Sequence, residues 1–349
     1  MNTRIEKIEN NSRKMEILQD AGDVIQRGGL VAFPTETVYG LGGDALNPES
    51  SKKIYAAKGR PSDNPLIVHI AEWESIHRIC MDIPDTAEKL AKVFWPGPLT
   101  MILKKTELVP HETTGGLDTV AVRMPDHPVA LPFIRAAGGY IAAPSANTSG
   151  RPSPTSAEHV IEDMDGRIEM ILDGGDVGIG VESTIVDLTE EIPVILRPGY
   201  VTAEMLDRVL GHVETDITLM HGDTKQKPKA PGMKYRHYAP KGTLTLIEGN
   251  PEVVVRTINE HIQECKRDGR KVGVMCTDEI IEQIQTDCKK SLGSRSDEHE
   301  IARRLYRVLR EFDEEEAEVI YSESFPADGF GQAVMNRLLK AAGYHVDKV

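Results

Sequence analysis

The 349-residue sequence has few aromatic residues, few cysteines and no long apolar run. Its four cysteines are Cys80, Cys265, Cys276 and Cys288, and no two of them form a Cys-x-x-Cys pair. This scatter excludes a zinc ribbon or a disulfide framework and is typical of reduced thiols. No stretch reaches the ~20 apolar residues that a membrane helix needs, and residues 1–6 lack the apolar core of a signal peptide. We therefore expect a cytoplasmic protein without membrane association.

Several catalytic and nucleotide-binding motifs are also missing. The sequence contains no Walker loop and no Gly-x-Ser-x-Gly elbow, and no histidine stands beside Ser145 to activate it as a nucleophile. The segment 178–183 resembles a dinucleotide loop but lacks its third glycine. No histidine and cysteine cluster has the spacing of a metal site. A phosphate site in this chain must therefore be built from other residues.

Acidic residues outnumber basic ones, 55 to 41, which gives a formal net charge of −14. Residues 1–205 contain 19 basic and 30 acidic residues, a balance of −11. Only the short segment 206–241 is positive, with 7 basic against 4 acidic residues. Because a protein that coats nucleic acid needs a basic face, the composition argues against that class. The positive segment is distinct from what surrounds it.

The hydrophobic pattern predicts two α/β domains, which is also what the length favours. In the first domain, short apolar runs alternate with amphipathic segments, which indicates a large twisted, mixed sheet. The expected strands cover 30–33, 66–70, 99–103, 120–123, 140–143, 168–172, 183–187 and 194–197, and the expected helices cover 16–28, 50–57, 85–94 and 129–137. We predict a turn at 34–37 and only a run of small residues at 38–42.

A basic, proline-punctuated segment at 225–232 predicts a semi-extended linker. After it, strands at 244–247, 271–276 and 317–321 alternate with helices at 253–266, 278–285, 298–312 and 331–342. This alternation predicts a smaller, doubly wound, Rossmann-like α/β domain.

Two short polar segments are the most informative part of the sequence. Lys58 and Arg60 stand one residue apart, and Ser145 and Asn147 repeat that spacing downstream. Alternate residues of an extended segment point the same way, so we expect each pair to project together. Arginine grips phosphate in a bidentate fork, and lysine acts as a mobile point charge. The quartet therefore suits a polyanion, with phosphate as the best candidate, although either half alone could be an ordinary solvated loop.

Other polar and basic residues fall near predicted strand ends, where ligands gather in open α/β sheets. Each has an ordinary structural explanation by itself: a turn cap, a buried histidine or a surface ion pair. Together, with no matching cluster of acids, they predict a cavity for anionic groups. They are Thr35, Ser62, His69, Thr119, Arg123, Ser153, Ser183 and Arg197.

Longer ordered motifs resemble the YrdC-like family of threonylcarbamoyl-AMP synthases. They lie at 34–41, 58–61, 95–100, 123–125, 144–150 and 182–187, and the segment 231–240 is similar to the linker of the two-domain members. The resemblance covers nearly the whole chain. It implies a YrdC-like catalytic domain at 15–205, a linker or lid at 206–241 and a Rossmann-like domain at 242–349.

The resemblance also implies a reaction, in which L-threonine, bicarbonate and ATP give L-threonylcarbamoyladenylate and pyrophosphate. The product feeds a tRNA threonylcarbamoyl transferase that modifies an adenosine beside the anticodon. The enzyme would be a nucleotidyltransferase that uses Mg²⁺ with its ATP, through protein ligands that the sequence does not identify. Contact with tRNA itself would be transient or absent, and the sequence does not give the oligomeric state.

Residue roles follow from the same resemblance. The catalytic tetrad falls on Lys58, Arg60, Ser145 and Asn147. Threonine recognition falls on Thr35, His69, Arg123, the Ala143 backbone and Ser183. ATP contacts fall on Lys58, Ser62, Thr119, Ser145, Ser153, Arg197 and, from the linker, Arg236 or Tyr238.

Two other functions stay open at this point. Relatives of the first domain have been viewed as binding double-stranded RNA, but the balance of −11 over residues 1–205 disfavours a phosphate-backbone surface. A carbamoyl-transfer domain of the hydrogenase-maturation type shares the YrdC-like fold. That type carries zinc-finger and acylphosphatase-like modules, and this sequence shows neither.

Overall fold

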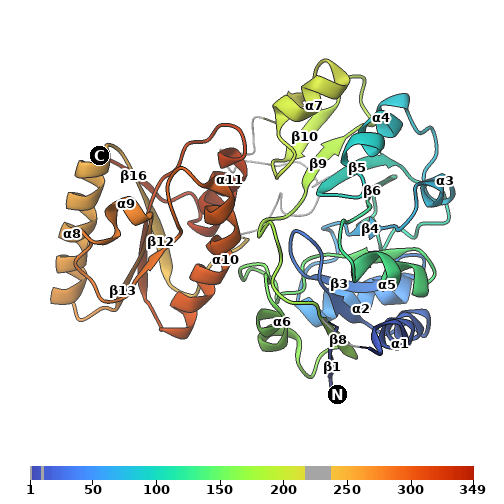
Figure 1. Ribbon diagram of the computed structural model, residues 1–349, viewed down its shortest axis with the longest axis horizontal. Coiled ribbons are helices and arrows are strands. Elements are labelled where there is room, and N and C mark those ends of the chain that lie inside the picture. The colour runs from blue at the N-terminus through green and yellow to red at the C-terminus, as the bar shows by residue number, and fades with distance from the viewer. Residues whose placement is uncertain (1, 9–11, 217–236) are drawn as a thin grey trace. The chain divides into compact units, whose positions relative to one another are not determined.

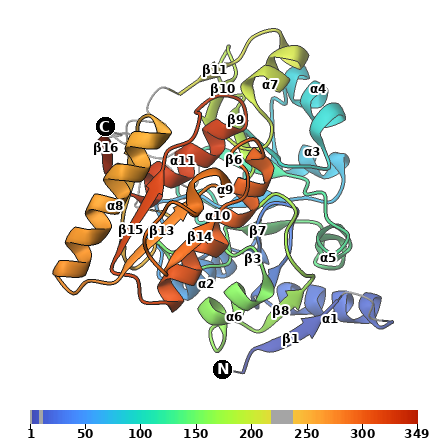
Figure 2. The same ribbon diagram turned by 60° about the vertical axis from the view of Figure 1, so that its left-hand side comes forward.

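The computed structural model describes residues 2–8, 12–216 and 237–349. Their contacts divide the chain into two compact units, one formed mainly by the part up to residue 216 and the other by the part from 237 onward. Three residues, Gly150–Pro152, belong to the second unit although they interrupt the first in sequence. Figures 1 and 2 show that each unit is a sheet with helices against it.

The first unit contains an 11-stranded mixed sheet with both parallel and antiparallel pairs, as the sequence pattern predicts. The strand order is β1-β8-β2-β3-β7-β4-β6-β5-β9-β10-β11. The strands are β1 (Arg4–Lys7), β2 (Val31–Phe33), β3 (Gly40–Asp44), β4 (Ile67–His69), β5 (Leu99–Lys104), β6 (Thr119–Arg123), β7 (Ile141–Ala143), β8 (Met170–Asp173), β9 (Thr184–Asp187), β10 (Val194–Arg197) and β11 (Glu214–Thr215).

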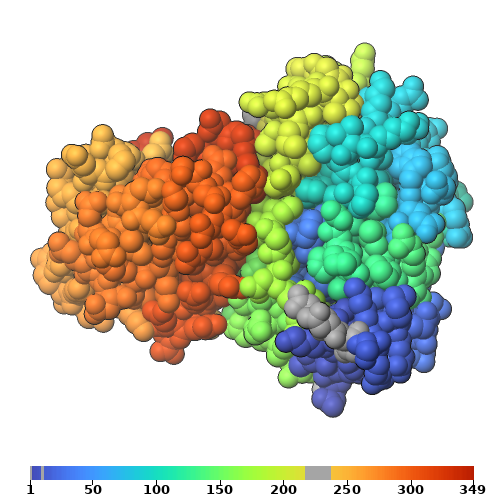
Figure 3. Space-filling model, viewed as in Figure 1, coloured from blue at the N-terminus to red at the C-terminus, as the bar shows by residue number. Residues whose placement is uncertain are grey.

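Helices cover this sheet unequally. Buried residues of α1 and α5 pack on one half of one face, with Val31, Phe33 and Ile141. A larger core on the opposite face includes residues of α2, α4, α6 and α7. Figure 3 shows α4 (cyan) and α7 (yellow-green) at the surface of this unit. The helical elements are α1 (Lys14–Gln26), α2 (Pro48–Lys58), η1 (Trp73–Ser75), α3 (Ile76–Ile79), α4 (Asp85–Phe94), α5 (Ala130–Ala136), α6 (Ala157–Met164) and α7 (Ala203–Leu210).

The other half of the α1/α5 face carries a small apolar cluster made from strand residues alone: Ile67, Ile102, Ala121, Ile185 and Leu196. Ala143 is the register partner of Ile67, and partners in register point to the same face of a sheet. Ala143 belongs to the core under α1 and α5. The cluster of strand residues therefore continues that face beyond the two helices, and the polar residues of interest lie beside it.

The run of small residues at 38–42 was assigned no secondary structure from the sequence, and a strand begins within it. Gly40–Asp44 forms β3, antiparallel to β2 and β7. A Cβ atom at Gly42 would lie 2.9 Å from Ile141 Cγ2 and 3.1 Å from the Phe33 ring. Tertiary crowding therefore requires glycine here, although glycine is a poor strand former by itself.

The second unit is a smaller, fully parallel sheet in the order β14-β13-β15-β12-β16. Helices α8 and α9 lie on one face of it, and α10 and α11 lie on the other (Figure 1). This is the predicted doubly wound arrangement. The elements are β12 (Thr243–Glu248), α8 (Pro251–Arg267), β13 (Val272–Cys276), α9 (Asp278–Ile281), β14 (Lys289–Ser291), α10 (Glu298–Glu314), β15 (Val319–Glu323), α11 (Gly331–Ala341) and β16 (Val346–Lys348).

Some boundaries differ from the sequence prediction. The helix expected at 278–285 ends at Ile281, and the strand expected at 317–321 runs from Val319 to Glu323. Helices α6 and α7, and strands β1, β11, β14 and β16, were not predicted. Most of these are short elements whose pattern is no stronger than that of a loop. The predicted linker segment at 225–232 lies outside the described residues.

Candidate active site

The end of α2 brings Lys58 to Ser145 and Asn147. Asn47 caps the start of this helix by accepting a hydrogen bond from the Glu49 N–H at 3.0 Å, and Pro48 fits its first turn. The helix ends at Lys58, followed by Gly59 in the left-handed region at φ +61°. The buried Lys58 ammonium donates to the carbonyl oxygens of Ser145 and Asn147, and its Nζ lies 3.4 Å from Asn147 Oδ1. These acceptors are neutral oxygen atoms, and they fix the position of the ammonium group.

Lys58 and Arg60 were expected on an extended segment, and this part of the prediction was wrong. Lys58 is helical, and Gly59 reverses the chain direction before Arg60. The buried Arg60 guanidinium donates to the carbonyl oxygens of Asn64 and Pro65 at 3.0 and 3.2 Å. It also lies 5.8 Å from the centre of the Tyr55 ring. The helix cap, rather than strand alternation, decides where the two cations point.

A row of polar residues crosses the part of the sheet face that α1 and α5 do not cover. His69 pairs in register with Arg123, and Arg123 with Thr100. Thr100 pairs with Ile185, which in turn pairs with Arg197. Register partners share a face, so these side chains project from the same side of β4, β6, β5 and β10. The site therefore lies on the face of the sheet as well as at the strand ends where it was expected.

Arg123 is held by an incomplete set of contacts. Its Nη2 lies 2.7 Å from Glu36 Oε2, and both side chains are largely buried. Its Nε donates weakly to the Gly97 carbonyl at 3.4 Å. Neither oxygen of Glu36 nor Nη2 of Arg123 makes a well-aligned hydrogen bond. A buried ion pair in this state is costly, and a ligand with both charges could complete it.

His69 is neutral throughout the physiological range. Burial of the imidazole, together with the charge of Arg123, lowers its pKa to about 3. Its Nδ1 is 3.2 Å from the carbonyl oxygen of Ile67. A neutral imidazole here can donate or accept a hydrogen bond, but it adds no charge to the site.

Ser183 and Arg197 form a second buried group at the end of the row. Arg197 Nε donates to the Ser183 carbonyl at 3.0 Å, and its Nη2 donates to Ser183 Oγ at 3.1 Å. Thr100 Oγ1 lies 2.8 Å from the same Ser183 hydroxyl. Arg197 was predicted to contact ATP and Ser183 to contact L-threonine, and the two residues are hydrogen-bonded to each other.

The strand register separates the predicted ligands along β7, β4 and β6. Ser145 follows the end of β7 at the edge where β4 and β6 begin, because β7 is antiparallel to β4. Thr119 begins β6 at that same edge, whereas His69 and Arg123 end their strands at the opposite edge. We call these the Ser145 edge and the Arg123 edge. The predicted ATP residues Lys58, Ser145 and Thr119 gather at the Ser145 edge, where Ala143 also ends β7. Of the predicted threonine residues, His69, Arg123 and Ser183 lie at the Arg123 edge.

The remaining predicted residues have more ordinary surroundings. The buried Thr35 hydroxyl donates to the Val38 carbonyl at 2.6 Å, which is a turn-capping role. Ser153 donates to Glu182 Oε1 at 2.5 Å, whereas Ser62 is exposed. Ala143 is buried as the last residue of β7. Tyr238 stacks on Tyr306 of the second unit at 5.2 Å, and Arg236 lies outside the described residues.

Three residues of these surroundings were not selected from the sequence: Glu36, Thr100 and Glu182. All three lie inside motifs that the sequence analysis quoted. Two of them are acids, and a cavity expected to bind anions does not predict carboxylates in its lining. Their positions in the motifs could have identified them. Glu36 is next to Thr35, Glu182 is next to Ser183, and Thr100 follows the proline-rich turn before β5.

The described residues contain no group of three or more His, Cys, Asp or Glu side chains that could hold a metal ion. Among the same residues, no helix is long and apolar enough to cross a membrane. The four cysteines are buried and unpaired.

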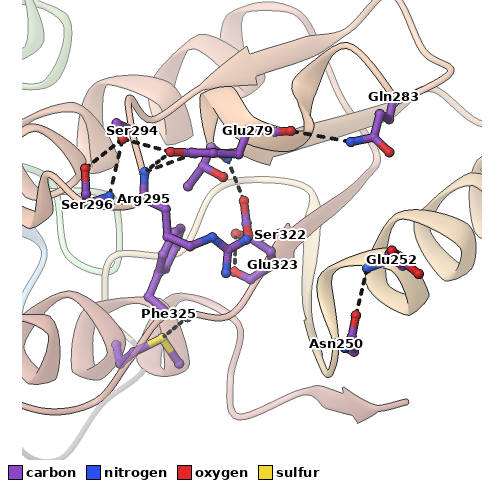
Figure 4. Close-up of polar contacts among 12 residues, drawn as sticks. Asn250, Glu252, Glu279, Gln283, Ser294, Arg295, Ser296, Ser322, Glu323 and Phe325 are labelled. Carbon is purple, nitrogen blue, oxygen red and sulfur yellow. Dashed lines mark hydrogen bonds and ion pairs between the residues drawn. The ribbon is translucent and has the colours of Figure 1, made fainter.

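The second unit has its own polar cluster, at the carboxyl ends of β13 and β15 (Figure 4). Glu323 accepts a hydrogen bond from the Thr277 N–H at 2.6 Å and another from Arg295. Glu279 accepts from the Ser294 hydroxyl at 2.8 Å and from the Arg295 N–H. Both carboxylates are satisfied by neighbouring groups, whereas the buried Thr277 Oγ1 beside them makes no hydrogen bond.

The first unit is a mixed-sheet domain with a buried cationic site, and the second is a parallel α/β domain. Comparison with known families agrees. Residues 23–199 match the family model described as "Telomere recombination", and residues 201–343 match the one described as "Threonylcarbamoyl-AMP synthase, C-terminal domain".

Similar proteins extend over nearly the whole chain. A threonylcarbamoyl-AMP synthase of Bacillus subtilis is 51% identical over 330 residues, which is 94% of each chain. The crystal structure of Pyrococcus abyssi Sua5 complexed with L-threonine is 49% identical, with a TM-score of 0.92 over 100% of this chain and 99% of that one. Escherichia coli YciO, at 22% identity and a TM-score of 0.50 over 56% of this chain, shares the fold of the first unit. The chain belongs to the threonylcarbamoyl-AMP synthase family in its two-domain form.

Proposed function

We propose that this chain is an L-threonylcarbamoyladenylate synthase, which converts L-threonine, bicarbonate and ATP to threonylcarbamoyl-AMP and pyrophosphate. The observation that carries the proposal is the separation of two cationic groups along the same short strands. Lys58 lies with Ser145 and Asn147 at one edge, and Arg123 lies with His69 at the other. β4 has three residues, so the edges are roughly 7 Å apart at ~3.3 Å per residue. That spacing suits an amino acid beside the α-phosphate of a nucleotide.

The Arg123 edge suits the zwitterion of an α-amino acid. Arg123 can hold a carboxylate in a fork, and Glu36 can accept hydrogen bonds from an ammonium group. The incompletely bonded Arg123–Glu36 pair would be completed by such a ligand. Neutral His69, Ser183, Thr35 and the Ala143 backbone then provide hydrogen-bonding groups around the threonine side chain.

The Ser145 edge suits the triphosphate. Lys58 and Arg60 are buried cations whose acceptors, where described, are neutral carbonyl groups. Ser145, Asn147, Ser62 and Thr119 add hydrogen-bonding groups on the same side, and Ser153 lies beside Glu182. Arg197, and Arg236 or Tyr238 from the linker, are further proposed contacts to ATP. Fixed charges of this kind stabilise the charge that develops on a transferring phosphoryl group.

The reaction has two bond-forming steps. The threonine amine, once deprotonated, adds to the carbon of bicarbonate, and loss of water gives a carbamate. A carbamate oxygen then attacks the α-phosphorus of ATP, and the bond to the β-phosphate oxygen breaks to release pyrophosphate. Both partners in the second step are anionic. The principal task of Lys58, Arg60 and Arg123 is therefore to offset charge repulsion and to order the three ligands.

Magnesium is proposed to arrive with ATP. The described residues offer no three-carboxylate or histidine cluster, and Mg²⁺ bound mainly by phosphates and water needs none. The chain's residues fit a metal held in this way, and Mg²⁺ would supply further charge neutralisation at the phosphates.

The wider assignment is part of the same proposal. The enzyme acts as a nucleotidyltransferase, with a catalytic domain at 15–205, a linker that covers the nucleotide at 206–241 and a C-terminal domain at 242–349. Its product passes to a tRNA threonylcarbamoyl transferase. The buried, unpaired cysteines support a cytoplasmic setting.

A product assay tests the function. Purified protein is given ATP, Mg²⁺, L-threonine and bicarbonate, and each is omitted in turn while pyrophosphate and adenylate are measured. We expect pyrophosphate release to require both L-threonine and bicarbonate, and a threonylcarbamoyl adenylate to accumulate. Pyrophosphate release without L-threonine or without bicarbonate would overturn the proposal. Salt-sensitive tRNA binding without turnover would overturn it as well.

A further inference from the structure

Three hydrogen-bonded side chains of the first unit form a buried series that ends beside Arg123. Arg197 Nη2 donates to Ser183 Oγ at 3.1 Å, and Ser183 Oγ lies 2.8 Å from Thr100 Oγ1. Ser183 and Thr100 are fully buried, and Arg197 is 4% exposed. Thr100 pairs in register with Arg123, so both side chains project from the same face of the sheet. We call Arg197, Ser183 and Thr100 the Ser183 network.

The two hydroxyl groups of the Ser183 network have one proton more than they have acceptors. Each hydroxyl has one proton and two lone pairs, whereas an arginine can only donate. Arg197 therefore occupies one lone pair of Ser183. The contact between Ser183 and Thr100 uses one hydroxyl proton, whichever residue donates it. Within the described part of the chain neither hydroxyl makes another hydrogen bond, so the second proton has no acceptor there.

The charge of Arg197 favours one direction for the hydrogen bonds in the Ser183 network. Hydrogen bonds in series polarise one another, so a hydroxyl that accepts from a cation becomes a better donor. Because Ser183 accepts from the guanidinium, we assign the shared proton to Ser183 as donor and Thr100 as acceptor. The proton without an acceptor is then that of Thr100. A buried donor in this state is costly, and its position beside Arg123 indicates an acceptor on the ligand.

L-Threonine has one neutral group that can accept this proton. Its carboxylate and ammonium groups match the two charges of the Arg123–Glu36 ion pair. The β-hydroxyl group remains, and the uncharged Thr100 hydroxyl suits an uncharged oxygen. L-Valine has nearly the same shape but places a methyl group at that position. Its binding would leave the Thr100 proton buried without an acceptor, which costs binding free energy.

We propose that Thr100 is a specificity-determining residue that donates a hydrogen bond to the β-hydroxyl of L-threonine, with Ser183 and Arg197 orienting its hydroxyl. This role rests on the proposed function, which makes L-threonine the substrate. A site that hydrogen-bonds a substrate hydroxyl rejects the analogue without it much more strongly than an apolar pocket does. The Ser183 network thus selects L-threonine over L-valine, whereas Arg123 and Glu36 bind the groups that all α-amino acids share.

The test compares L-threonine with L-valine, each titrated by calorimetry into the full native chain and into Thr100→Val. This substitution keeps the shape of the side chain and removes its hydroxyl. We expect the Kd for L-threonine to rise about tenfold, because a hydrogen bond in a buried site is lost. The Kd for L-valine should stay the same or fall, so the preference for L-threonine decreases by about tenfold or more. Thr100→Ser retains the hydroxyl and should retain most of the native preference.

Thr113→Val is the matched control, because Thr113 is equally buried but its hydroxyl donates to the Ala45 carbonyl at 2.9 Å. It should lower the melting temperature and leave the preference for L-threonine over L-valine unchanged. If Thr100→Val does not fold, Ser183→Ala decides the question, since it interrupts the same network and should reduce the preference to a similar extent.

Three results would overturn the inference: a native chain without a preference for L-threonine, an unchanged preference in the folded variant, or equal losses for L-threonine and L-valine. Equal losses would mean that the Thr100 hydroxyl serves a group common to both amino acids. A native chain that prefers L-threonine to L-valine but releases no threonine-dependent pyrophosphate would refute the proposed function alone.

Discussion

Each unit contains a buried glutamate paired with an arginine near the end of a strand, but the two pairs are completed differently. In the second unit, Glu323 accepts hydrogen bonds from Thr277 and Arg295. In the first, Glu36 lies 2.7 Å from Arg123, yet neither of its oxygens makes a well-aligned hydrogen bond. The closed pair is structural, whereas the open pair retains bonding capacity for a ligand.

This difference gives a physical criterion for the site. Buried polar groups in folded proteins are nearly always hydrogen-bonded, so an incompletely bonded ion pair needs an explanation. Burial alone does not provide it, because Glu323 and Glu36 are both largely buried. What separates the two pairs is whether the protein supplies all the partners. Four predictions test the two units, in order of decreasing effect. The second and third compare the two glutamate–arginine pairs directly.

The largest effect is expected for Lys58→Ala. Removal of a fixed charge beside a transferring phosphoryl group should lower turnover by a factor of about 100 or more while the fold is kept. Threonine-dependent pyrophosphate release measures it, with circular dichroism as the check on folding. Lys52→Ala is the matched control, since Lys52 is on the same helix in an exposed pair with Glu49. Near-native turnover of Lys58→Ala would remove this residue from the mechanism.

Arg123→Lys tests the open pair directly. Lysine keeps the charge but loses the fork that can hold a carboxylate. We expect the Kd for L-threonine to rise about tenfold or more, as measured by calorimetry, because a charge-assisted hydrogen bond is lost. Arg295→Lys in the closed pair should leave that Kd unchanged. If both substitutions weaken threonine binding equally, the contrast between the pairs is false.

Glu323→Gln tests the closed pair. The amide cannot replace the charged acceptor for Arg295, so we expect the second unit to lose about 1–3 kcal/mol of stability. Chemical denaturation followed by a probe in that unit measures the loss. L-threonine binding should stay native, since Glu323 takes no part in the proposed site. A weaker affinity for L-threonine with unchanged stability would reverse the assignment of the two pairs.

The smallest effect concerns pH. Burial lowers the pKa of His69 from 6.5 to about 3, so between these values the unfolded chain binds a proton that the folded chain does not. The folding stability that depends on neutral His69 is greatest above about pH 6.5 and decreases as the pH falls toward 3. The melting temperature of His69→Gln should therefore fall less between pH 7 and pH 5 than that of the native chain. His127, whose pKa burial lowers to about 4, contributes equally to both proteins, and identical pH profiles would contradict the prediction.

Much of the fold was predictable because its signals are local. The strands at β5, β6 and β10 and the helix at α4 are given by apolar runs and periodicity, and α4 ends where Trp95 and Pro96 follow. The mixed sheet of the first unit and the parallel sheet of the second were both expected. The strand β3 was missed because three of its five residues are glycines, and only contacts with Phe33 and Ile141 explain them.

The site was predictable only as a set of residue types. Lys58, Ser145 and Asn147 were expected together and lie together. The local conformation at Lys58 and Arg60 was predicted wrongly, because α2 continues to Lys58 and is capped at Gly59. The ion pair of Glu36 with Arg123 could not be predicted, because the two residues are far apart in sequence and become neighbours only in the folded chain.

The amino-acid sequence by itself determined the ordered motifs, the two α/β patterns and the family, since these depend on residue identity and short spacing. The tertiary structure alone decided which side chains meet. Cross-strand register placed His69 beside Arg123 and separated them from Ser145. Arg310 donates to the Pro152 carbonyl, although the two residues are more than 150 positions apart in the sequence. Register and topology are set by the packing of whole faces against each other, and no local segment carries that information.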